Sequence, residues 1–250
     1  MKKYGIIGYP LGHSLSKEFF NRKFEREGLD CVYENFELSH INLFPQLIKK
    51  EKSLIGLNVT LPYKVDVIQY LDKLDHEARD AGAVNVVKID IKGGRRSLKG
   101  FNSDIFGFVE SLRPILHAGI SSALILGTGG ASKAVAIGLK RLNIGYRFVS
   151  RTPGKDIQGY PELTEKVIRQ NLLIINSTPV GMFPDIGQSP PIPYQFLTEE
   201  HLLFDLVYNP AETIFLQKGL ERGSQIKNGL EMLELQAVRS WEIWNDKIME

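Results

Sequence analysis

A glycine-rich segment, residues 127–132 with the sequence GTGGAS, follows an apolar run and precedes a helix-like stretch. There, the first glycine permits a tight turn, the second lets the backbone approach a pyrophosphate, and the helix N-terminus offers N–H groups to phosphate oxygens. Ser132 replaces the third glycine of this fingerprint, and a P-loop is excluded because Ala134 stands where its magnesium-binding hydroxyl should be. The segment predicts a dinucleotide site at Gly127, Gly129, Gly130 and Ala131, the alternative being a glycine-rich turn without a ligand.

The next strand-like segment ends in Ser150, Arg151 and Thr152. An NAD site usually has an acidic residue at this place, about 20 residues after the loop, to bind the ribose 2′-hydroxyl. Here no carboxylate occurs before Asp156, whereas a guanidinium and two hydroxyls suit a 2′-phosphate. We therefore expect NADP rather than NAD, the alternative being that Arg151 is only a solvated surface residue.

Polar segments interrupt the apolar elements of the first half of the chain. They are residues 8–16, 58–64, 82–85 and 100–104. The first two follow strand-like segments, and ligand sites in open α/β sheets gather outside the carboxyl ends of strands. Taken singly, a polar segment of this kind more often forms a turn or a helix cap than a binding site. Ser14 and Ser16, for example, could simply cap a helix.

The elements that must position these segments alternate along the chain. Strand-like segments are residues 4–7, 32–38, 54–59, 123–126, 146–150, 172–175 and 202–207, with a hairpin of 83–90 and 97–100 around Gly93 and Gly94. Helix-like segments are residues 16–27, 43–52, 65–71, 75–80, 131–142, 211–222 and 230–249, and another helix starts at Asp104. This alternation predicts an α/β fold of parallel sheets with helices on both faces, and a domain boundary near residues 102–104.

Composition narrows the class of protein. The 250 residues carry a net charge of +2 with mixed charges, and residues 92–96 are best explained as a basic hairpin tip, so we expect no nucleic-acid partner. No apolar run is long enough to span a bilayer, so we expect no membrane partner. The single cysteine, Cys31, indicates a structural thiol in a reduced cytoplasm, and the scattered histidines indicate no metal.

Together, the polar segments resemble the motifs of the shikimate dehydrogenase family. Residues 8–16 match its Gly-x-Pro followed by His-Ser-x-Ser, and residues 58–64 match its Asn-Val-Thr-x-Pro-x-Lys without a change. Residues 82–85 match its Gly-Ala-x-Asn, and residues 100–104 match its Gly-x-Asn-Thr-Asp with Ser103 in place of threonine. Later matches are residues 176–182, 205–208 and 229–236, so the resemblance covers nearly the whole chain in order. Lys17, where many members have proline, is a departure.

The resemblance implies a mixed α/β substrate domain, residues 1–103 completed by a C-terminal helix 229–250, and a Rossmann-like NADP-binding domain, residues 104–228. It implies Lys64 and Asp104 as the catalytic pair. The substrate-binding residues that it implies are Ser14, Ser16, Asn58, Thr60, Lys64, Asn85, Asp104, Tyr208 and Gln236. The cofactor-binding residues that it implies are Gly127, Gly129, Gly130, Ala131, Ser150, Arg151, Thr152, Met182, Gly229 and Met232.

The implied activity is the reversible, NADPH-dependent reduction of 3-dehydroshikimate to shikimate, in aromatic amino acid and chorismate biosynthesis, by a cytoplasmic monomer or homodimer. Hydride transfer to a ketone leaves negative charge on oxygen, which a lysine oriented by a carboxylate can stabilise or protonate. Two alternatives stay open. One is a family member that uses NAD, quinate or a modified shikimate, and the other is a non-catalytic NADP-binding or metabolite-binding regulator on the same fold.

Overall fold

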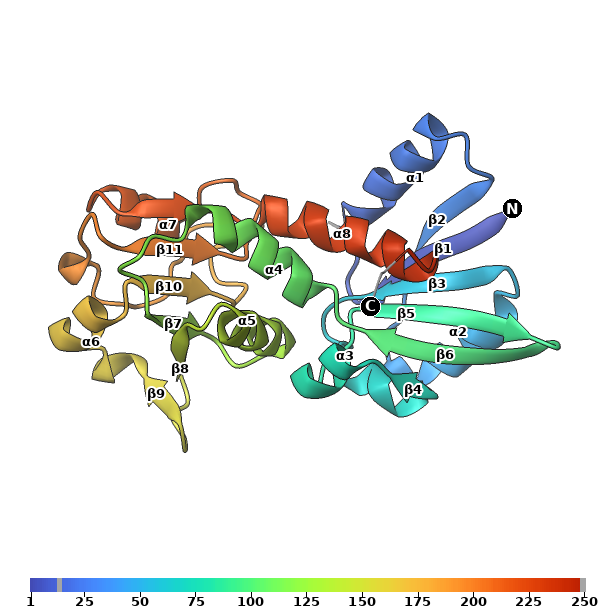
Figure 1. Ribbon diagram of the computed structural model, residues 1–250, viewed down its shortest axis with the longest axis horizontal. Coiled ribbons are helices and arrows are strands. Elements are labelled where there is room, and N and C mark those ends of the chain that lie inside the picture. The colour runs from blue at the N-terminus through green and yellow to red at the C-terminus, as the bar shows by residue number, and fades with distance from the viewer. Residues whose placement is uncertain (13–14, 248–250) are drawn as a thin grey trace. The chain divides into compact units, whose positions relative to one another are not determined.

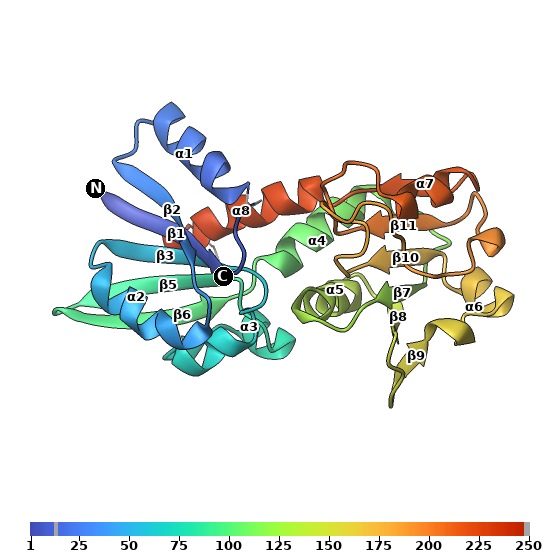
Figure 2. The ribbon, with the colours of Figure 1, turned by 180° about the vertical axis from the view of Figure 1, so that it is seen from behind.

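The computed structural model describes residues 1–12 and 15–247, which form two compact units (Figures 1 and 2). Unit 1 comprises residues 1–103 and the chain from Ala237 onward, and unit 2 comprises Asp104–Gln236. Both units are α/β, which confirms the predicted fold class. The sequence predicts that the C-terminal helix 229–250 completes the first domain, whereas in the structure the second part of unit 1 begins at Ala237. A Cβ at Gly107, in the first helix of unit 2, would lie 2.6 Å from the Met232 carbonyl oxygen, so residues around 232 pack within unit 2.

Unit 1 is built on a mixed sheet with the strand order β2-β1-β3-β5-β6-β4. Its elements are β1 (Lys2–Gly8), α1 (Ser16–Arg26), β2 (Cys31–Glu37), η1 (Ile41–Leu43), α2 (Phe44–Lys50), β3 (Leu54–Val59), η2 (Asp66–Tyr70), β4 (Lys73–Leu74), α3 (His76–Ala81), β5 (Val86–Lys92) and β6 (Arg95–Phe101). Strands β2, β1 and β3 are parallel, whereas β5 and β6 form an antiparallel hairpin. Gly93 and Gly94 have φ values of 56° and 76° there, as a two-residue hairpin turn requires.

Helices cover both faces of the unit 1 sheet (Figure 1). On one face, Phe20 and Phe24 of α1 pack with Trp241 and Trp244 of α8 (Leu230–Trp244) around the Tyr4 ring. The opposite face carries Phe44, Leu47, Val67 and Ala78 from α2, η2 and α3. Aromatic contacts of this kind add about 0.5–1.5 kcal/mol per pair beyond the burial of their surface. They explain why the C-terminal part of α8 belongs to unit 1.

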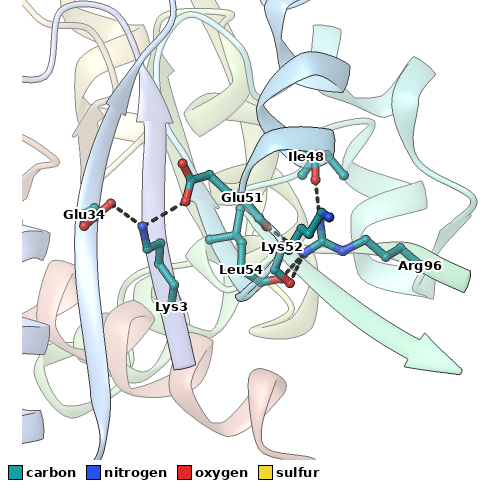
Figure 3. Close-up of polar contacts among 7 residues, drawn as sticks. All are labelled: Lys3, Glu34, Ile48, Glu51, Lys52, Leu54 and Arg96. Atoms are coloured by element: carbon teal, nitrogen blue, oxygen red, sulfur yellow. Dashed lines mark hydrogen bonds and ion pairs between the residues drawn. The ribbon is translucent and has the colours of Figure 1, made fainter. Parts of the chain in front are cut away.

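Two cations tie the outer elements of unit 1 to its sheet (Figure 3). The Lys3 ammonium lies 2.8 Å from Glu51 and 3.1 Å from Glu34, and these carboxylates raise the pKa of Lys3. The Arg96 guanidinium donates to the carbonyl oxygens of Ile48, Glu51, Lys52 and Leu54 around the end of α2. The predicted hairpin tip at residues 92–96 is confirmed, since Lys92 pairs with Arg95 and Ile91 with Arg96, and the Arg96 side chain binds backbone carbonyls of the same unit.

Unit 2 is built on a sheet with the order β12-β11-β10-β7-β8-β9, in which all neighbouring strands are parallel. Its elements are α4 (Asp104–Leu112), η3 (Arg113–Ile115), β7 (Ser122–Leu126), α5 (Gly130–Arg141), β8 (Gly145–Ser150), β9 (Ile157–Gly159), η4 (Tyr160–Glu162), α6 (Glu165–Gln170), β10 (Leu173–Asn176), η5 (Tyr194–Phe196), β11 (Leu202–Asp205), α7 (Ile214–Leu220) and β12 (Gln225–Lys227), followed by the start of α8. On one face, Phe215 and Leu216 of α7 pack with Ile168 of α6 on Leu124. The N-terminal helix α4 packs on α5, where a Cβ at Gly138 would meet Phe108 at 2.6 Å.

The helices near the C-terminus are shorter than predicted, and the structure gives a reason for each. The predicted helix 211–222 begins only at Ile214, because the Thr213 hydroxyl caps it by accepting from the Leu216 N–H. The predicted helix 230–249 ends at Trp244, since Asp246 has a φ of 53° and leaves the helical conformation. Residues 248 and 249 of that prediction lie outside the described residues.

Candidate functional site

The unit 2 sheet reverses its strand order between β7 and β10, which is the point where doubly wound folds bind dinucleotides. The loops that follow these two strands contact each other. The Ser177 hydroxyl, after β10, donates to the Leu126 carbonyl at 2.6 Å, and its oxygen lies 3.0 Å from the Ser132 hydroxyl, within hydrogen-bond distance. Ser132 is fully buried. The serine in place of the third fingerprint glycine therefore joins the two loops of the switch point.

The glycine loop has the backbone geometry that a pyrophosphate needs. Gly127 has a φ of 113°, and a Cβ there would lie 2.9 Å from Ser177 and Thr178. A Cβ at Gly129, in contrast, would have nothing within 4 Å, so its backbone is open to a ligand. Gly130 and Ala131 begin the 12-residue helix α5, whose first N–H groups have no carbonyl of the helix within reach. These features fit a bound dinucleotide phosphate.

The residues predicted to bind a 2′-phosphate follow β8, the strand next to β7. Arg151 and Thr152 are exposed, and the Thr152 N–H donates to the Ser150 hydroxyl at 3.3 Å. Burial raises the pKa of Tyr160, and the positive charge of Arg151 partly offsets that effect. The guanidinium therefore lies at the surface near β8, where it is accessible to a phosphate.

A buried carboxylate supports the loop after β10. Asp205 accepts hydrogen bonds from the Thr213 hydroxyl at 2.5 Å and from the Asn176 side chain at 3.0 Å. Asn176 in turn accepts from the N–H and hydroxyl of Thr178, at 3.1 and 2.6 Å. Burial raises the pKa of Asp205 to about 6, and these hydrogen bonds oppose the shift. Sequence reasoning did not assign a role to Asp205 or Thr213, although the segment 205–208 was recognised.

Four further predicted residues lie around the end of β11 and the start of α8. Gly229 packs so closely on the residue after β11 that a Cβ would lie 2.1 Å from the Leu206 carbonyl oxygen. Met232 is buried, and the Gln236 amide donates to the Leu233 carbonyl at 2.9 Å. Tyr208 is half-buried, which raises its pKa. Met182, after β10, is exposed and follows Gly181, whose φ is 88°.

In unit 1, three of the predicted substrate residues lie at or directly after the carboxyl end of β3. Asn58 lies on β3, and Thr60 and Lys64 come directly after it. Asn85 directly precedes the antiparallel strand β5, and its carbonyl accepts from the Val59 N–H at 2.8 Å. Lys64 is half-buried, and its carbonyl accepts from the Val84 N–H at 2.7 Å. The structure therefore brings the segments 58–64 and 82–85 together.

Ser14 and Ser16, the two serines predicted to bind substrate in the segment 8–16, differ in what the structure shows of them. Ser14 lies outside the described residues. Ser16 begins α1, but the N-cap position is Leu15 and no side chain caps the helix, so the capping interpretation is wrong for Ser16. Burial raises the pKa of Tyr33, and the nearby Ser16 side chain partly offsets that effect, so Ser16 lies close to the Tyr33 hydroxyl.

Asn58 and Asn85 belong to a buried polar network, which we name the asparagine network. Its members are Tyr33, Asn58, Asn85, Ser103 and Ser240. The Asn85 side chain accepts from the Ser103 N–H at 2.7 Å and donates to the Ser103 hydroxyl at 3.0 Å. Sequence reasoning missed Tyr33 and Ser240, because a tyrosine in a strand and a serine in a helix give no signal by themselves.

The second member of the predicted catalytic pair, Asp104, begins α4 and is only 6% exposed. It belongs to unit 2, whereas Lys64 belongs to unit 1. Within residues 1–12 and 15–247, no group of three or more His, Cys, Asp or Glu side chains could hold a metal ion. Across the same residues, no helix is both long and apolar enough to cross a membrane.

Comparison with known proteins gives the same family along the whole chain. Residues 6–87 match the family model described as "Shikimate dehydrogenase substrate binding domain". A shikimate dehydrogenase (NADP(+)) of Caldicellulosiruptor saccharolyticus is 35% identical, over 98% of this chain and 93% of its own length. One of Carboxydothermus hydrogenoformans is 36% identical, over 97% of this chain and 91% of its own.

Comparison with solved structures indicates the same family. The shikimate 5-dehydrogenase of Thermus thermophilus, in complex with NADP(H) and shikimate, superposes with a TM-score of 0.86 and 31% identity, covering 100% of this chain and 95% of its own. The chain belongs to the shikimate dehydrogenase family, which confirms the resemblance of its motifs.

Proposed function

We propose that this protein is a shikimate dehydrogenase, an oxidoreductase that reversibly reduces 3-dehydroshikimate to shikimate with NADPH. One observation carries the proposal. The segment 58–64 keeps the family motif unchanged at the carboxyl end of β3, inside the region that matches the substrate-binding domain. The curated relatives are named as NADP-dependent, and the Thermus thermophilus structure contains NADP(H) and shikimate.

The residues of unit 2 fit the cofactor. The open backbone at Gly129 and the N-terminus of α5 would bind the pyrophosphate, and Arg151 with Ser150 and Thr152 would bind the 2′-phosphate. Gly127, Met182, Gly229 and Met232 would line the same site. When bound, NADPH supplies the hydride.

In unit 1, neutral hydroxyl and amide groups suit a substrate with ring hydroxyls, since each can donate or accept hydrogen bonds. We assign Ser14 and Ser16 to the substrate carboxylate, and we assign the ring hydroxyls to Asn58, Thr60, Asn85, Asp104 and Gln236, with Tyr208 nearby. Lys64 would protonate or stabilise the oxygen on which negative charge develops, and Asp104 would orient the lysine and set its protonation.

The test is an absorbance assay for NADPH formation, with shikimate or quinate and with NADP or NAD in all four combinations. We expect the highest specificity constant for shikimate with NADP. A preference for quinate or NAD would favour the first alternative within the family. No turnover with any combination, in a protein that still binds NADP, would favour a non-catalytic regulator.

A further inference from the structure

The asparagine network fixes the orientation of the Asn58 amide. The Asn58 nitrogen donates to the Asn85 backbone carbonyl at 3.3 Å and to the Ser240 hydroxyl at 2.9 Å. A backbone carbonyl can only accept, so the nitrogen, not the oxygen, must face it. The Asn58 oxygen therefore faces Tyr33, whose hydroxyl donates to it at 2.8 Å.

This arrangement uses both N–H bonds of the Asn58 amide. An amide oxygen has two lone pairs, and Tyr33 occupies one of them. What Asn58 can still offer a ligand is one acceptor position and no donor. Of these side chains, Asn58 is the most exposed, at 5%, whereas Tyr33 and Ser240 are fully buried and Ser103 is 1% exposed.

Tyr33 and Ser240 are themselves held in place. The Tyr33 backbone exchanges two hydrogen bonds with the Asn21 side chain of α1, at 2.9 and 3.0 Å, and the Tyr33 ring stacks on Phe20 with centroids 4.6 Å apart. Ser240 lies on α8, where the Trp244 indole donates to the Val87 carbonyl at 3.1 Å. The two hydroxyls that orient Asn58 therefore come from β2 and α8, which contribute side chains to the same core cluster.

We infer that Tyr33 and Ser240 are positioning residues that make Asn58 an acceptor-only group, so that it selects a ligand hydroxyl, which must donate the hydrogen bond. This inference rests on the proposed function, because it takes Asn58 as a contact of the substrate. It names two residues outside the binding motifs as determinants of substrate specificity. A buried acceptor of this kind discriminates strongly against an analogue that cannot donate, since its oxygen would lose a partner.

Binding measurements on the whole chain test the positioning role. Tyr33→Phe and Ser240→Ala should each raise the dissociation constant for shikimate about fivefold, the net worth of one hydrogen bond, and leave that for NADP unchanged. Tyr194→Phe and Ser111→Ala are matched controls, because each removes one hydroxyl that donates to a backbone carbonyl in unit 2. In an Asn58→Ala background, Tyr33→Phe should change the constant less than about twofold. The inference would be overturned if Tyr33→Phe still raised the dissociation constant about fivefold in the Asn58→Ala background. It would also be overturned if neither single variant changed the affinity for shikimate.

Shikimate analogues test the acceptor-only character. Each ring hydroxyl is replaced in turn by hydrogen and by fluorine, which accepts but does not donate. At the position that faces Asn58, both replacements should weaken binding equally, and the loss should disappear in Asn58→Ala. If fluorine restored binding at every position relative to hydrogen, Asn58 would be a donor and the inference would be wrong.

A third measurement needs no substrate and separates this inference from the proposed function. Exchange of the Asn58 side-chain N–H protons is followed by NMR, with the signals assigned by their loss in Asn58→Ala. In Ser240→Ala, one of the two protons should exchange about fivefold faster or more, while Ser111→Ala leaves both unchanged. Unaltered exchange in Ser240→Ala would overturn the orientation of the amide. Absence of shikimate binding in the wild type would overturn the proposed function instead.

Discussion

The two units present polar groups to a ligand in opposite ways. In unit 1, Asn58 and Asn85 are buried and joined by hydrogen bonds, directly at the Asn85 carbonyl and also through Ser240 and Ser103, so little of their hydrogen-bonding capacity is left for a ligand. In unit 2, the backbone at Gly129 is open and Arg151 is exposed. The difference corresponds to the proposed ligands. A ring with neutral hydroxyls is discriminated by oriented side chains, whereas a phosphate is bound by backbone N–H groups and charge.

Removing the proposed proton donor should have the largest effect. Lys64→Ala should lower turnover by at least about 10²-fold, while the Michaelis constants for shikimate and NADP change much less, because the lysine acts where charge develops. Steady-state kinetics measures both, and Lys49→Ala, an exposed lysine of the same unit, is the control. Near-normal turnover in folded Lys64→Ala would remove the catalytic assignment.

The buried Asp205 should make the stability of unit 2 depend on pH. Burial raises its pKa from 3.8 to about 6, so the folded chain holds this proton more tightly than the unfolded chain. The unfolding free energy should therefore fall as the pH rises from about 4 to about 6, by about 3 kcal/mol at about 1.4 kcal/mol per pH unit. Denaturant titrations at several pH values measure this fall in the unfolding free energy. Asp205→Asn should abolish it, whereas Asp185→Asn, a control at an exposed carboxylate, should leave it unchanged.

Two glycines of one loop should separate folding from binding. Gly127→Ala should lower the unfolding free energy by about 1–3 kcal/mol, because alanine meets Ser177 and Thr178 and φ is 113°. Gly129→Ala should leave stability nearly unchanged and weaken NADP binding, since its Cβ would occupy the open space over the loop. Thermal denaturation and NADP titration distinguish the two. Equal stability losses would show that Gly129 also has a structural role.

The smallest effect is expected at Arg151, because the guanidinium is exposed and screened by salt. Arg151→Ala should narrow the preference for NADP over NAD by about 1–2 kcal/mol, about 5- to 30-fold, without a change in stability. The measurement is the ratio of the specificity constants for the two cofactors. An unchanged ratio would place the 2′-phosphate elsewhere, and a wild type that prefers NAD would overturn the cofactor assignment.

The sequence predicted those elements that a continuous apolar run or a pair of glycines marks within a few residues. The apolar run at residues 123–126 with the following glycines gave β7, the loop and α5, and Gly93 with Gly94 gave the β5–β6 hairpin. The short elements β9, α6 and β12 were missed, because their 3 to 6 residues contain no continuous apolar run of the kind that indicated β10 and β11.

Side-chain networks were not predictable in the same way. Ser240 contacts Asn58 across 182 positions of the chain, and the Thr213 hydroxyl reaches Asp205 only after the backbone turns between β11 and α7. Such partners depend on tertiary packing. Motif matching found Asn58 and Asn85 but not the residues that orient them.

The most direct test of this division between the units is hydrogen–deuterium exchange of the whole chain with each ligand alone. NADP should slow exchange around residues 126–133, 150–152 and 177–182, and shikimate should slow it around residues 54–64 and 83–86. Protection of these unit 2 loops by NADP and of these unit 1 segments by shikimate is the result that this account predicts. Protection of unit 1 by NADP alone, or of the glycine loop by shikimate alone, would contradict it.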